Sequence, residues 1–202
     1  MLASFAIDRP YLKMMVAFIF VFANCFSVTS EAKRGTIGEN CKGSAAMNIR
    51  RAQARDLEAV DRLLSQVLTI HAELRPDLFL PGTRKYTDSE LLAIFADECS
   101  PVFVAEDADG AVLGYCFCQL QERRGLNNMP DGRELYIDDL CVDETARGRH
   151  VGRQLYEYVL AYARGLGCGA VTLNVWQGND AARIFYERMG MTVRKTVMEV
   201  KI

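Results

Sequence analysis

Two adjacent carboxylates interrupt an apolar stretch of the chain, and acid–base chemistry is one explanation for them. Asp138 and Asp139 lie in the sequence YIDDLCV, which otherwise has the composition of a buried strand. Carboxylates in such a strand lower stability unless they are solvated or hydrogen-bonded. Regular alternation assigns one face to Tyr136, Asp138, Leu140 and Val142, and the other to Ile137, Asp139 and Cys141. The two carboxylates are therefore either functional groups or the exposed end of a strand.

A basic, glycine-containing loop follows this strand. It runs through Arg147, Gly148, Arg149, His150, Val151, Gly152 and Arg153. The loop leads into a helix, whose first backbone N–H groups have no partner and lie at the positive end of the helix dipole. The glycines let a ligand approach the backbone closely, and the arginines add positive charge. The pattern predicts a phosphate or pyrophosphate site, with a plain β–α connection bearing a basic face as the alternative.

A second stretch, NVWQGNDAARIFYERMGM, carries a tyrosine near the end of a short helix. The spacing is that of an amphipathic helix with Ile184, Phe185 and Met189 on its apolar side, ended by Gly190. Tyr186 is then either a reactive phenol or a ring packed at the end of the helix.

The elements that position these residues follow from hydrophobic periodicity and capping signals. Asp56 is the expected N-cap of one helix, and Thr87 with Glu90 forms the capping box of the next. We expect strands at 48–52, 102–106, 111–120, 134–142, 170–175 and 193–200, and the last two helices at 151–164 and 180–189. This order predicts an α/β (α+β) domain, a mixed sheet flanked by helices.

Composition excludes several classes of protein. Half of the 202 residues are hydrophobic and the net charge is -2, which argues against disorder and against general binding of nucleic acid. The seven cysteines form no CxxC pair and there are only two histidines, so no metal site is expected. We interpret most cysteines as small buried residues of a reducing compartment, which favours a cytoplasmic protein.

Residues 1–46 differ from the rest of the chain. The run MMVAFIFVFANCF, from Met14 to Phe26, is apolar but shorter than the ~20 residues of a membrane-spanning helix. It has the outline of a signal peptide or short anchor without a clear cleavage site. The alternative is a spurious upstream extension, with Met47 as the true start. Either way, the sequence predicts one domain over 47–202.

The basic loop resembles the coenzyme A-binding signature of the GNAT acetyltransferases, [Q/R]-x-x-G-x-[G/A]. Arg147, Val151 and Gly152 match it, and His150 replaces the usual glycine. The later stretch resembles the family signature N-x-x-A-x-x-[FL]-Y-x-x-x-G-[FM], with Asn179, Ala182, Phe185, Tyr186, Gly190 and Met191 in register. The resemblance implies a GNAT-type sheet in a single domain, acetyl-CoA as cosubstrate and no metal.

The resemblance also implies roles for individual residues. Tyr186 would be the acid that faces the CoA sulfur, and Asp138 the base that takes the proton of the acceptor amine. The backbone of Leu140, Cys141 and Val142 would pair with pantetheine, and the loop Arg147–Arg153 would hold the pyrophosphate. Asn179 would contact the pantetheine arm or orient the loop, and Asp139 would be structural, bonded to a loop.

The expected activity is acetyl transfer to a primary amine of a small molecule or peptide. A catalytically idle acyl-CoA-binding domain and a signal-anchored envelope protein are the alternatives. Asn174 and Trp176, with the regions 73–87 and 125–132, would line the acceptor site. The family also makes a homodimer a reasonable expectation.

Overall fold

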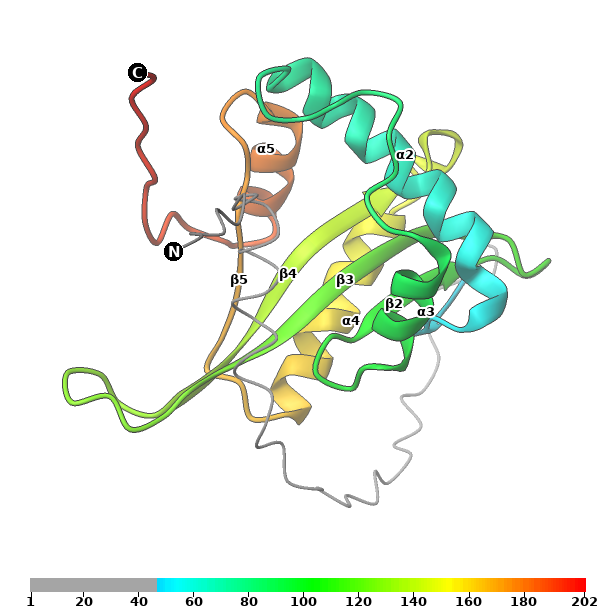
Figure 1. Ribbon diagram of the computed structural model, residues 1–202. Coiled ribbons are helices and arrows are strands. Elements are labelled where there is room, and N and C mark those ends of the chain that lie inside the picture. Colours follow the sequence, from blue (N-terminus) through cyan, green and yellow to red (C-terminus); the bar gives the residue numbers. More distant parts are fainter. Residues whose placement is uncertain (1–46) are drawn as a thin grey trace, which may run out of the picture. The chain divides into compact units, whose positions relative to one another are not determined.

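The computed structural model describes residues 47–202, which form one five-stranded sheet. The strands are β1 Asn48–Arg51, β2 Val102–Glu106, β3 Val112–Arg123, β4 Gly132–Val142 and β5 Ala170–Leu173. They lie in the order β1-β2-β3-β4-β5, and only the last pair, β4 and β5, is parallel (Figure 1). The sheet is therefore mixed, as the sequence predicted.

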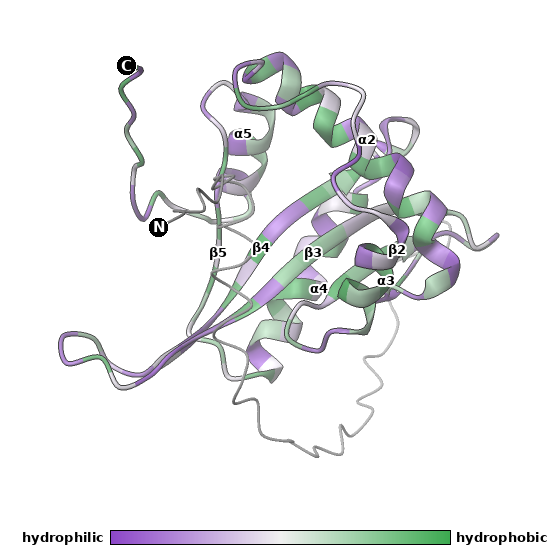
Figure 2. Cartoon of the chain, viewed as in Figure 1, coloured by the Kyte–Doolittle hydropathy of each residue, from purple (hydrophilic) through white to green (hydrophobic). Residues whose placement is uncertain are grey.

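Helices cover both faces of the sheet. They are α2 Leu57–Leu74, α3 Asp88–Ala96, α4 Val151–Gly165 and α5 Asp180–Arg188, with short 3-10 helices η2 Ala54–Asp56 and η3 Glu144–Ala146. The buried faces of α2 and α3 pack with one side of the sheet, and α4 packs with the other. The fold is thus a three-layer α/β arrangement, and hydrophobic and hydrophilic residues alternate along its helices (Figure 2).

The two cores follow directly from the predicted periodicities. Val60, Leu63 and Leu64 of α2 are buried, as their 3.6-residue spacing requires. Leu155 and Val159 of α4 are buried on the opposite side of the sheet. The thiols of Cys116, Cys118 and Cys141 are also buried, which confirms the interpretation of these three as small core residues.

Strands β3, β4 and β5 differ in length from the prediction. The hairpin of β3 and β4 extends to Arg123 and Gly132, so its loop is shorter than expected and its tip projects far from α2 (Figure 1). The expected contribution of residues 125–132 to the acceptor site stays a prediction. Strand β5 ends at Leu173, two residues early.

The expected strand at 193–200 is absent from the described structure. Residues 192–202 are all exposed and form no strand. Three ion pairs join the segment to the rest of the domain: Arg194 to Glu134, Glu199 to Arg75 and Lys201 to Asp77. A strand needs a neighbouring backbone, and none pairs with this segment within the described residues. The apolar residues also do not alternate throughout, because Val197 and Met198 are adjacent.

Asp56 precedes α2 as predicted, but its side chain does not cap the helix. Its carboxylate instead accepts two hydrogen bonds from the guanidinium of Arg50 at 2.7 and 2.8 Å, and one from the backbone N–H of Gln53. The acidic residue thus ties β1 to the start of α2, which a capping rule does not foresee.

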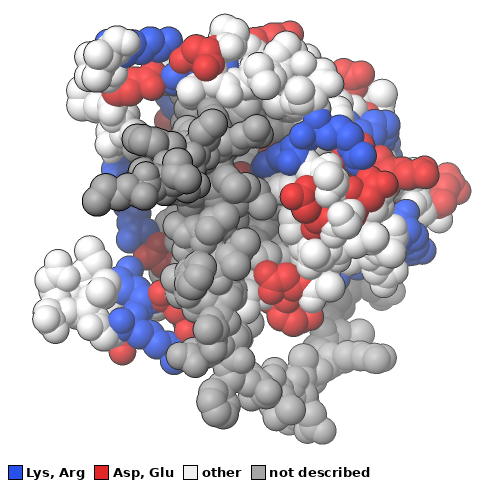
Figure 3. All heavy atoms as spheres, in the orientation of Figure 1, with Lys and Arg blue, Asp and Glu red and all other residues white. Residues whose placement is uncertain are grey.

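The signal-like segment and the other expectations for residues 1–46 lie outside the described residues. From Met47 onward, none of the helices combines the length and the apolar character needed to cross a membrane. On the face shown in Figure 3, basic and acidic side chains are interspersed, in keeping with the small net charge.

Candidate active site

The centre of the candidate site is a β-bulge in β4. Phe117 of β3 lies opposite Asp139, and the next residue, Cys118, lies opposite Ile137. Asp138 is therefore an extra residue without a partner on β3. Bulges of this kind bend a strand and change the direction of its side chains.

The bulge reverses the alternation of faces that the sequence predicted. Before it, Leu135 and Ile137 pack on the α4 side of the sheet; after it, Leu140 and Val142 do so. Cys141 packs on the α2 side instead. The expectation that Asp138 and Leu140 share a face, with Asp139 on the other, is wrong because regular alternation fails at an inserted residue.

As a result, both carboxylates reach the same ammonium group. The Nζ atom of Lys85, in the loop before α3, lies 3.1 Å from Asp138 Oδ2 and 3.8 Å from Asp139 Oδ2. Asp139 also accepts a hydrogen bond of 3.1 Å from the hydroxyl of Tyr115 on β3. Contacts within the fold thus hold Asp139, although its hydrogen-bond donor lies on a strand and not on the expected loop.

The charges of this cluster are strongly coupled. Burial raises the pKa of the Asp139 carboxyl, and the nearby Lys85 ammonium opposes this without cancelling it. Burial would lower the pKa of Lys85, but the charges of Asp139 and Asp138 outweigh burial and raise it. Burial, with a smaller effect of Lys85, lowers the pKa of His71, so this imidazole is neutral at pH 7.

Strands β4 and β5 separate beside the bulge. Their ladder ends with the pair Ile137–Leu173, whereas β4 continues to Val142. Leu140, Cys141 and Val142 thus lie on a part of β4 that β5 does not pair with. Backbone groups on such an edge can accept the hydrogen bonds of an extended ligand.

The basic loop contains two residues in the left-handed conformation, Gly148 with φ 79° and His150 with φ 62°. His150 is the N-cap of α4, and no side-chain hydrogen bond from the described residues caps this end of the helix. The first N–H groups of α4 therefore lack a side-chain acceptor there. His150 replaces the glycine of the signature, yet it adopts the backbone conformation that favours glycine.

Gly152 lies where the basic loop packs closely against β4 and against the helix of the second motif. A Cβ atom at this position would lie 3.3 Å from Cγ2 of Val142 and 3.6 Å from Cζ of Phe185. The first turn of α4 can approach both β4 and α5 because this side chain is absent. Arg147 and Arg149 are exposed, while Arg153 pairs with Glu157 at 2.8 Å.

Tyr186 lies on the α4 side of the sheet, opposite to the side of Asp138. It packs among Tyr156 and Phe185, with ring centroids 6.1 and 5.0 Å away. Burial raises the pKa of its hydroxyl, and the nearby Cys116 and Asp139 contribute in the same direction. The phenol is thus protonated at neutral pH and able to donate a proton or hydrogen bond.

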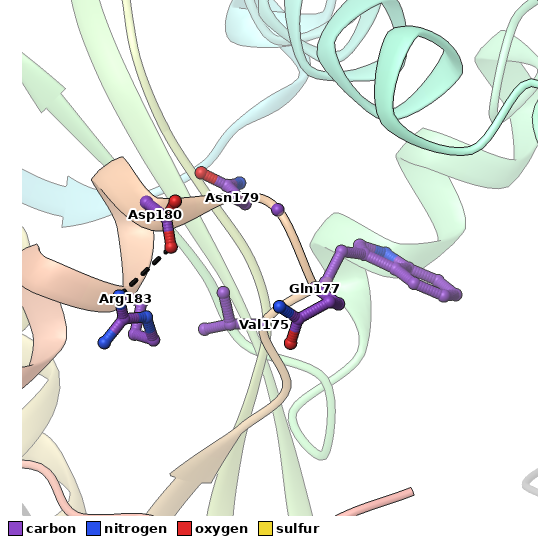
Figure 4. A pocket seen from close by; sticks show the side chains of 7 residues that line it. Val175, Gln177, Asn179, Asp180 and Arg183 are labelled. Atoms are coloured by element: carbon purple, nitrogen blue, oxygen red, sulfur yellow. Dashed lines mark hydrogen bonds and ion pairs between the residues drawn. The ribbon is translucent and has the colours of Figure 1, made fainter. Parts of the chain in front are cut away.

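Asn179 lies at the start of α5, where its side-chain oxygen accepts a hydrogen bond of 3.2 Å from the N–H of Ala182. It also borders a small hollow with Val175, Gln177, Asp180 and Arg183 (Figure 4). The ion pair Asp180–Arg183, 3.1 Å long, lies on the α5 side of this hollow. The residue therefore shapes the turn before α5, and both roles expected for it stay predictions.

Aromatic side chains form a wall at the end of α2. The ring of Phe79 lies 5.0 Å from that of His71 and 5.4 Å from that of Trp176, and the guanidinium of Arg75 lies 5.6 Å from the Trp176 ring. The amide of Asn174 donates a hydrogen bond of 3.0 Å to the hydroxyl of Tyr136 on β4. Both Asn174 and Trp176 thus lie near the carboxylate side of the sheet.

Sequence reasoning missed Lys85, Tyr115 and His71. Tyr115 occupies an ordinary alternating position of β3, and Lys85 lies in a polar loop, so neither carries a local signal. Only the folded arrangement assigns them to Asp138 and Asp139. Within residues 47–202, no group of three or more potential ligands is arranged to hold a metal ion.

Comparison with known proteins agrees with this geometry. The acetyltransferase (GNAT) family profile matches residues 66–191, more than half of the chain. The chain is 27% identical over 115 residues to glucosamine 6-phosphate N-acetyltransferase of Arabidopsis thaliana, covering 57% of this chain and 67% of that one. It is 27% identical over 146 residues to the putative phosphinothricin acetyltransferase YwnH of Bacillus subtilis, covering 71% and 83%. The match to a rice glucosamine 6-phosphate N-acetyltransferase spans about half of that enzyme, 49%.

Solved structures share the fold. A point mutant of the BH1408 protein from Bacillus halodurans superposes with a TM-score of 0.74 at 34% identity, covering 77% of this chain and 99% of that one. Aminoglycoside N-acetyltransferase AAC(6')-Iy in complex with CoA gives a TM-score of 0.58 at 18% identity, covering 81% and 99%, and shows the fold alone.

The fold and the two motifs define an N-acetyltransferase. The chain belongs to the acetyltransferase (GNAT) family.

Proposed function

We propose that the protein transfers the acetyl group of acetyl-CoA to a primary amine of a small molecule or peptide. The observation that carries this proposal is the bulge at Asp138, beside the point where β4 and β5 separate. It directs two carboxylates to one side of the sheet, while Tyr186 lies on the other. An acid and a base thus flank one open strand edge.

The chain offers suitable contacts for acetyl-CoA along this edge. Pantetheine would lie along the backbone of Leu140, Cys141 and Val142, and Asn179 would hold the turn beside it. The pyrophosphate would bind the N–H groups at the start of α4, which Gly148, His150, Val151 and Gly152 present. Arg147, Arg149 and Arg153 would supply positive charge, which phosphate groups require in addition to hydrogen bonds.

Acetyl-CoA supplies an activated thioester, and the residues of the chain would manage the protons. Asp138 would accept the proton of the acceptor ammonium, so that the neutral amine can attack the carbonyl carbon. Tyr186 would donate a proton to the departing sulfur. General acid–base catalysis of this kind contributes ~10²–10⁴-fold, and holding the two substrates together adds to it.

The charges near the bulge favour a cationic acceptor. Two carboxylates face one ammonium in the cluster of Asp138, Asp139 and Lys85, which leaves one negative charge when all three are ionised. A protonated amine would balance it. The aromatic wall of His71, Phe79 and Trp176 offers apolar contact area nearby. Glucosamine 6-phosphate and phosphinothricin, named for relatives, are therefore the first amines to assay.

We further propose that the enzyme works in the cytoplasm. The Sγ atoms of Cys116 and Cys118 lie 3.7 Å apart in the core, and an oxidising compartment would expose such a pair to covalent linkage during folding. A reducing compartment keeps both as thiols.

Calorimetric titration of the protein with acetyl-CoA tests the cosubstrate site. Gly152→Glu introduces a charged side chain where a Cβ already meets Val142 and Phe185, and should abolish binding. Gly165→Glu is the matched control, since Gly165 lies in the same helix with nothing within 4 Å of its Cβ position. Equal binding by both variants would contradict the assigned site.

Turnover separates an enzyme from an idle acyl-CoA-binding domain. Wild type, Asp138→Asn and Tyr186→Phe are compared by thiol release with a panel of amines. Both variants should bind acetyl-CoA normally and lose ~10²-fold or more in turnover. Binding of acetyl-CoA without turnover on any amine would favour the idle domain, and normal turnover by Asp138→Asn would remove this carboxylate from the mechanism.

A further inference from the structure

One buried side-chain oxygen on α2 has no hydrogen-bond partner. It is the amide oxygen, Oε1, of Gln66, and none of the described residues donates a hydrogen bond to it. A buried oxygen without a donor costs free energy, and native structures supply a protein group, a water or a ligand for nearly every such atom. The other atom of this kind among the described residues, Nη1 of Arg51, belongs to a guanidinium whose Nη2 donates to the backbone oxygens of Phe95 and Asp97. Gln66 is therefore the clearer case of a group that lacks its donor.

The helix directs this side chain toward the end of β4. A spacing of four residues places Gln66 on the same side of α2 as Arg62, one turn earlier. Arg62 forms an ion pair with Asp143, the residue directly after β4. At the other end of the helix, the Cδ2 atom of Leu74 lies 3.2 Å from the position that a Cβ of Gly178 would occupy, in the turn before α5. The helix thus reaches from the end of β4 to the turn before α5 (Figure 1), and Gln66 lies between the two contacts.

Gln66 also lies beside the part of β4 that β5 leaves unpaired. The thiol of Cys141 donates a weak hydrogen bond of 3.6 Å to the backbone oxygen of Leu63, less than one turn before Gln66. Cys141 belongs to the stretch 140–142, which has no partner on β5. With about 100° of rotation per residue, the side chain of Gln66 projects between the directions of Arg62 and Leu63. The unpartnered oxygen is therefore close to the level of Cys141, on the flank of α2 that faces the open edge of β4.

We propose that Gln66 binds the pantetheine arm of acetyl-CoA, its amide oxygen accepting a hydrogen bond from an amide N–H of that arm. The inference rests on the proposed function, under which the arm lies along Leu140, Cys141 and Val142. An extended chain beside a strand directs only part of its N–H groups to that strand, and the others need acceptors elsewhere. Gln66, on the helix that covers this end of the sheet, supplies one such acceptor.

The chemistry of this oxygen suits an amide of the arm better than the acceptor amine. A protonated amine has the carboxylates of Asp138 and Asp139 as partners, whereas an amide N–H needs no charge. A neutral oxygen binds a neutral N–H without bringing a charge into a buried position. Because the donor arrives only with acetyl-CoA, the unpaired oxygen destabilises the free protein, and the complex is relieved of this cost. Removing the oxygen should therefore have opposite effects on the free protein and on the complex.

Gln66→Met tests the proposal in the full chain, because methionine keeps the length and the helix propensity of glutamine and lacks both polar atoms of its amide. Calorimetric titration should show that acetyl-CoA binds this variant about five- to tenfold more weakly than wild type. The unfolding midpoint of the free variant should equal or exceed that of wild type. Ser65→Ala is the matched control and should leave the affinity unchanged, since Ser65 is exposed and its hydroxyl bonds to the backbone oxygen of Asp61 in the same helix.

Analogues of acetyl-CoA identify the donor. In each analogue an ester oxygen replaces one amide N–H of the pantetheine arm, so that the shape is kept and one donor is lost. For one of these analogues, wild type and Gln66→Met should bind with the same affinity, because the hydrogen bond is absent from both complexes. A difference in affinity that persists with every analogue would overturn the proposal.

Unchanged acetyl-CoA affinity in Gln66→Met would also overturn it, and a raised KM for an amine found active in the turnover assay would then move the residue to the acceptor site. Weaker binding together with a lower unfolding midpoint would mean that Gln66 supports the fold and does not meet the ligand. These outcomes leave the proposed function standing, since wild type still binds acetyl-CoA and turns it over. An absence of acetyl-CoA binding by wild type would instead remove the proposed function, and this inference with it.

Discussion

Asp138 has no partner on β3, and this single extra residue changes the direction of every side chain after it in β4. Without the bulge, Asp138 and Asp139 would point to opposite faces of the sheet, and one loop lysine could not contact both. With it, Lys85 lies within 4 Å of both carboxylates. The local charge balance of the site thus depends on backbone register as much as on residue type.

Lys85→Met should therefore make stability depend more strongly on pH. Burial already raises the pKa of Asp139 in the folded protein, and losing the ammonium raises it further. A group whose folded pKa exceeds its unfolded value stabilises at low pH, and this stability is lost as pH rises through the folded pKa. We expect a loss of about 1–2 kcal/mol at pH 8 and less at pH 5, measured by chemical unfolding.

Lys85→Arg, which keeps the positive charge, is the control for this prediction and should show a smaller effect. An identical loss at pH 5 and pH 8 for Lys85→Met would mean that packing of the lysine stem, rather than its charge, stabilises the loop.

His150 allows a test of whether the backbone or the side chain matters in the basic loop. Its φ of 62° is unfavourable for residues with a Cβ and most unfavourable for β-branched ones. His150→Gly should keep acetyl-CoA affinity within about twofold and raise stability slightly, by about 0.5–1 kcal/mol. His150→Val should lower both. Calorimetry and thermal unfolding measure the two quantities, and strong binding by the valine variant would show that the loop does not need the left-handed conformation.

The sequence reveals some of these residues and conceals others for physical reasons. The loop Arg147–Arg153 and Tyr186 stand out because their chemistry depends on local spacing, which a linear pattern records. Tertiary structure alone brings Lys85 to Asp138, across 53 positions of the chain, and Tyr115 to Asp139, across 24. The bulge leaves no mark in the sequence, because an inserted strand residue resembles any other.

At the scale of elements, η3 connects β4, the strand that contains Asp138 and Asp139, to the basic loop. Asp143 is the N-cap of η3, and its carboxylate accepts hydrogen bonds from the N–H and the hydroxyl of Thr145. The same carboxylate forms an ion pair with Arg62 of α2. These contacts fix the direction in which the chain leaves β4. A change at Asp143 should therefore reach the start of α4, which only residues 147–150 separate from η3.

Asp143→Ala should cost about 1–2 kcal/mol of stability at pH 7 and weaken acetyl-CoA binding, because both the cap and the ion pair are lost. Asp143→Asn keeps an acceptor for Thr145 and should lose less. The hydrogen bond from Arg62 lowers the pKa of Asp143 to about 2. A lowered pKa contributes stability above the unfolded value, and this is lost as pH falls toward 2.

Unfolding of wild type and Asp143→Ala is thus compared at pH 7 and near pH 3. The difference between them should shrink at the lower pH as the carboxyl becomes protonated. A difference that stays constant with pH would show that the charge of Asp143 does not contribute.

Helices and strands are predicted correctly from the sequence where burial within the domain alone determines them. Helix α4 buries one regular face against its own domain, and strand β2 is a short apolar run buried on both faces, so their local patterns are sufficient. The predicted strand 193–200 fails because no neighbouring backbone pairs with it among the described residues, although the outer edge of β5 has no strand beside it there. A period of two thus reports the capacity to pair, and whether pairing occurs depends on what lies alongside.

At the scale of the whole molecule, the elements that build the two described cores all lie within residues 47–202. Strand β1 begins at Asn48 and pairs with β2 over four residues, and Arg50 ties it to Asp56 and Glu106. The first strand is therefore held by contacts with residues that follow Met47.

Removal of residues 1–46 should accordingly leave the domain intact. The chain 47–202 is expected to unfold cooperatively, with a midpoint within a few degrees of that of the full chain, and to bind acetyl-CoA with the same affinity. Differential scanning calorimetry and titration of both proteins provide the comparison. A fall in midpoint by about ten degrees would correspond to a loss of about 2.5–5 kcal/mol, and would show that residues before Met47 contribute to the fold. Equal midpoints together with membrane association of the full chain alone would assign those residues an anchoring role that the domain does not share.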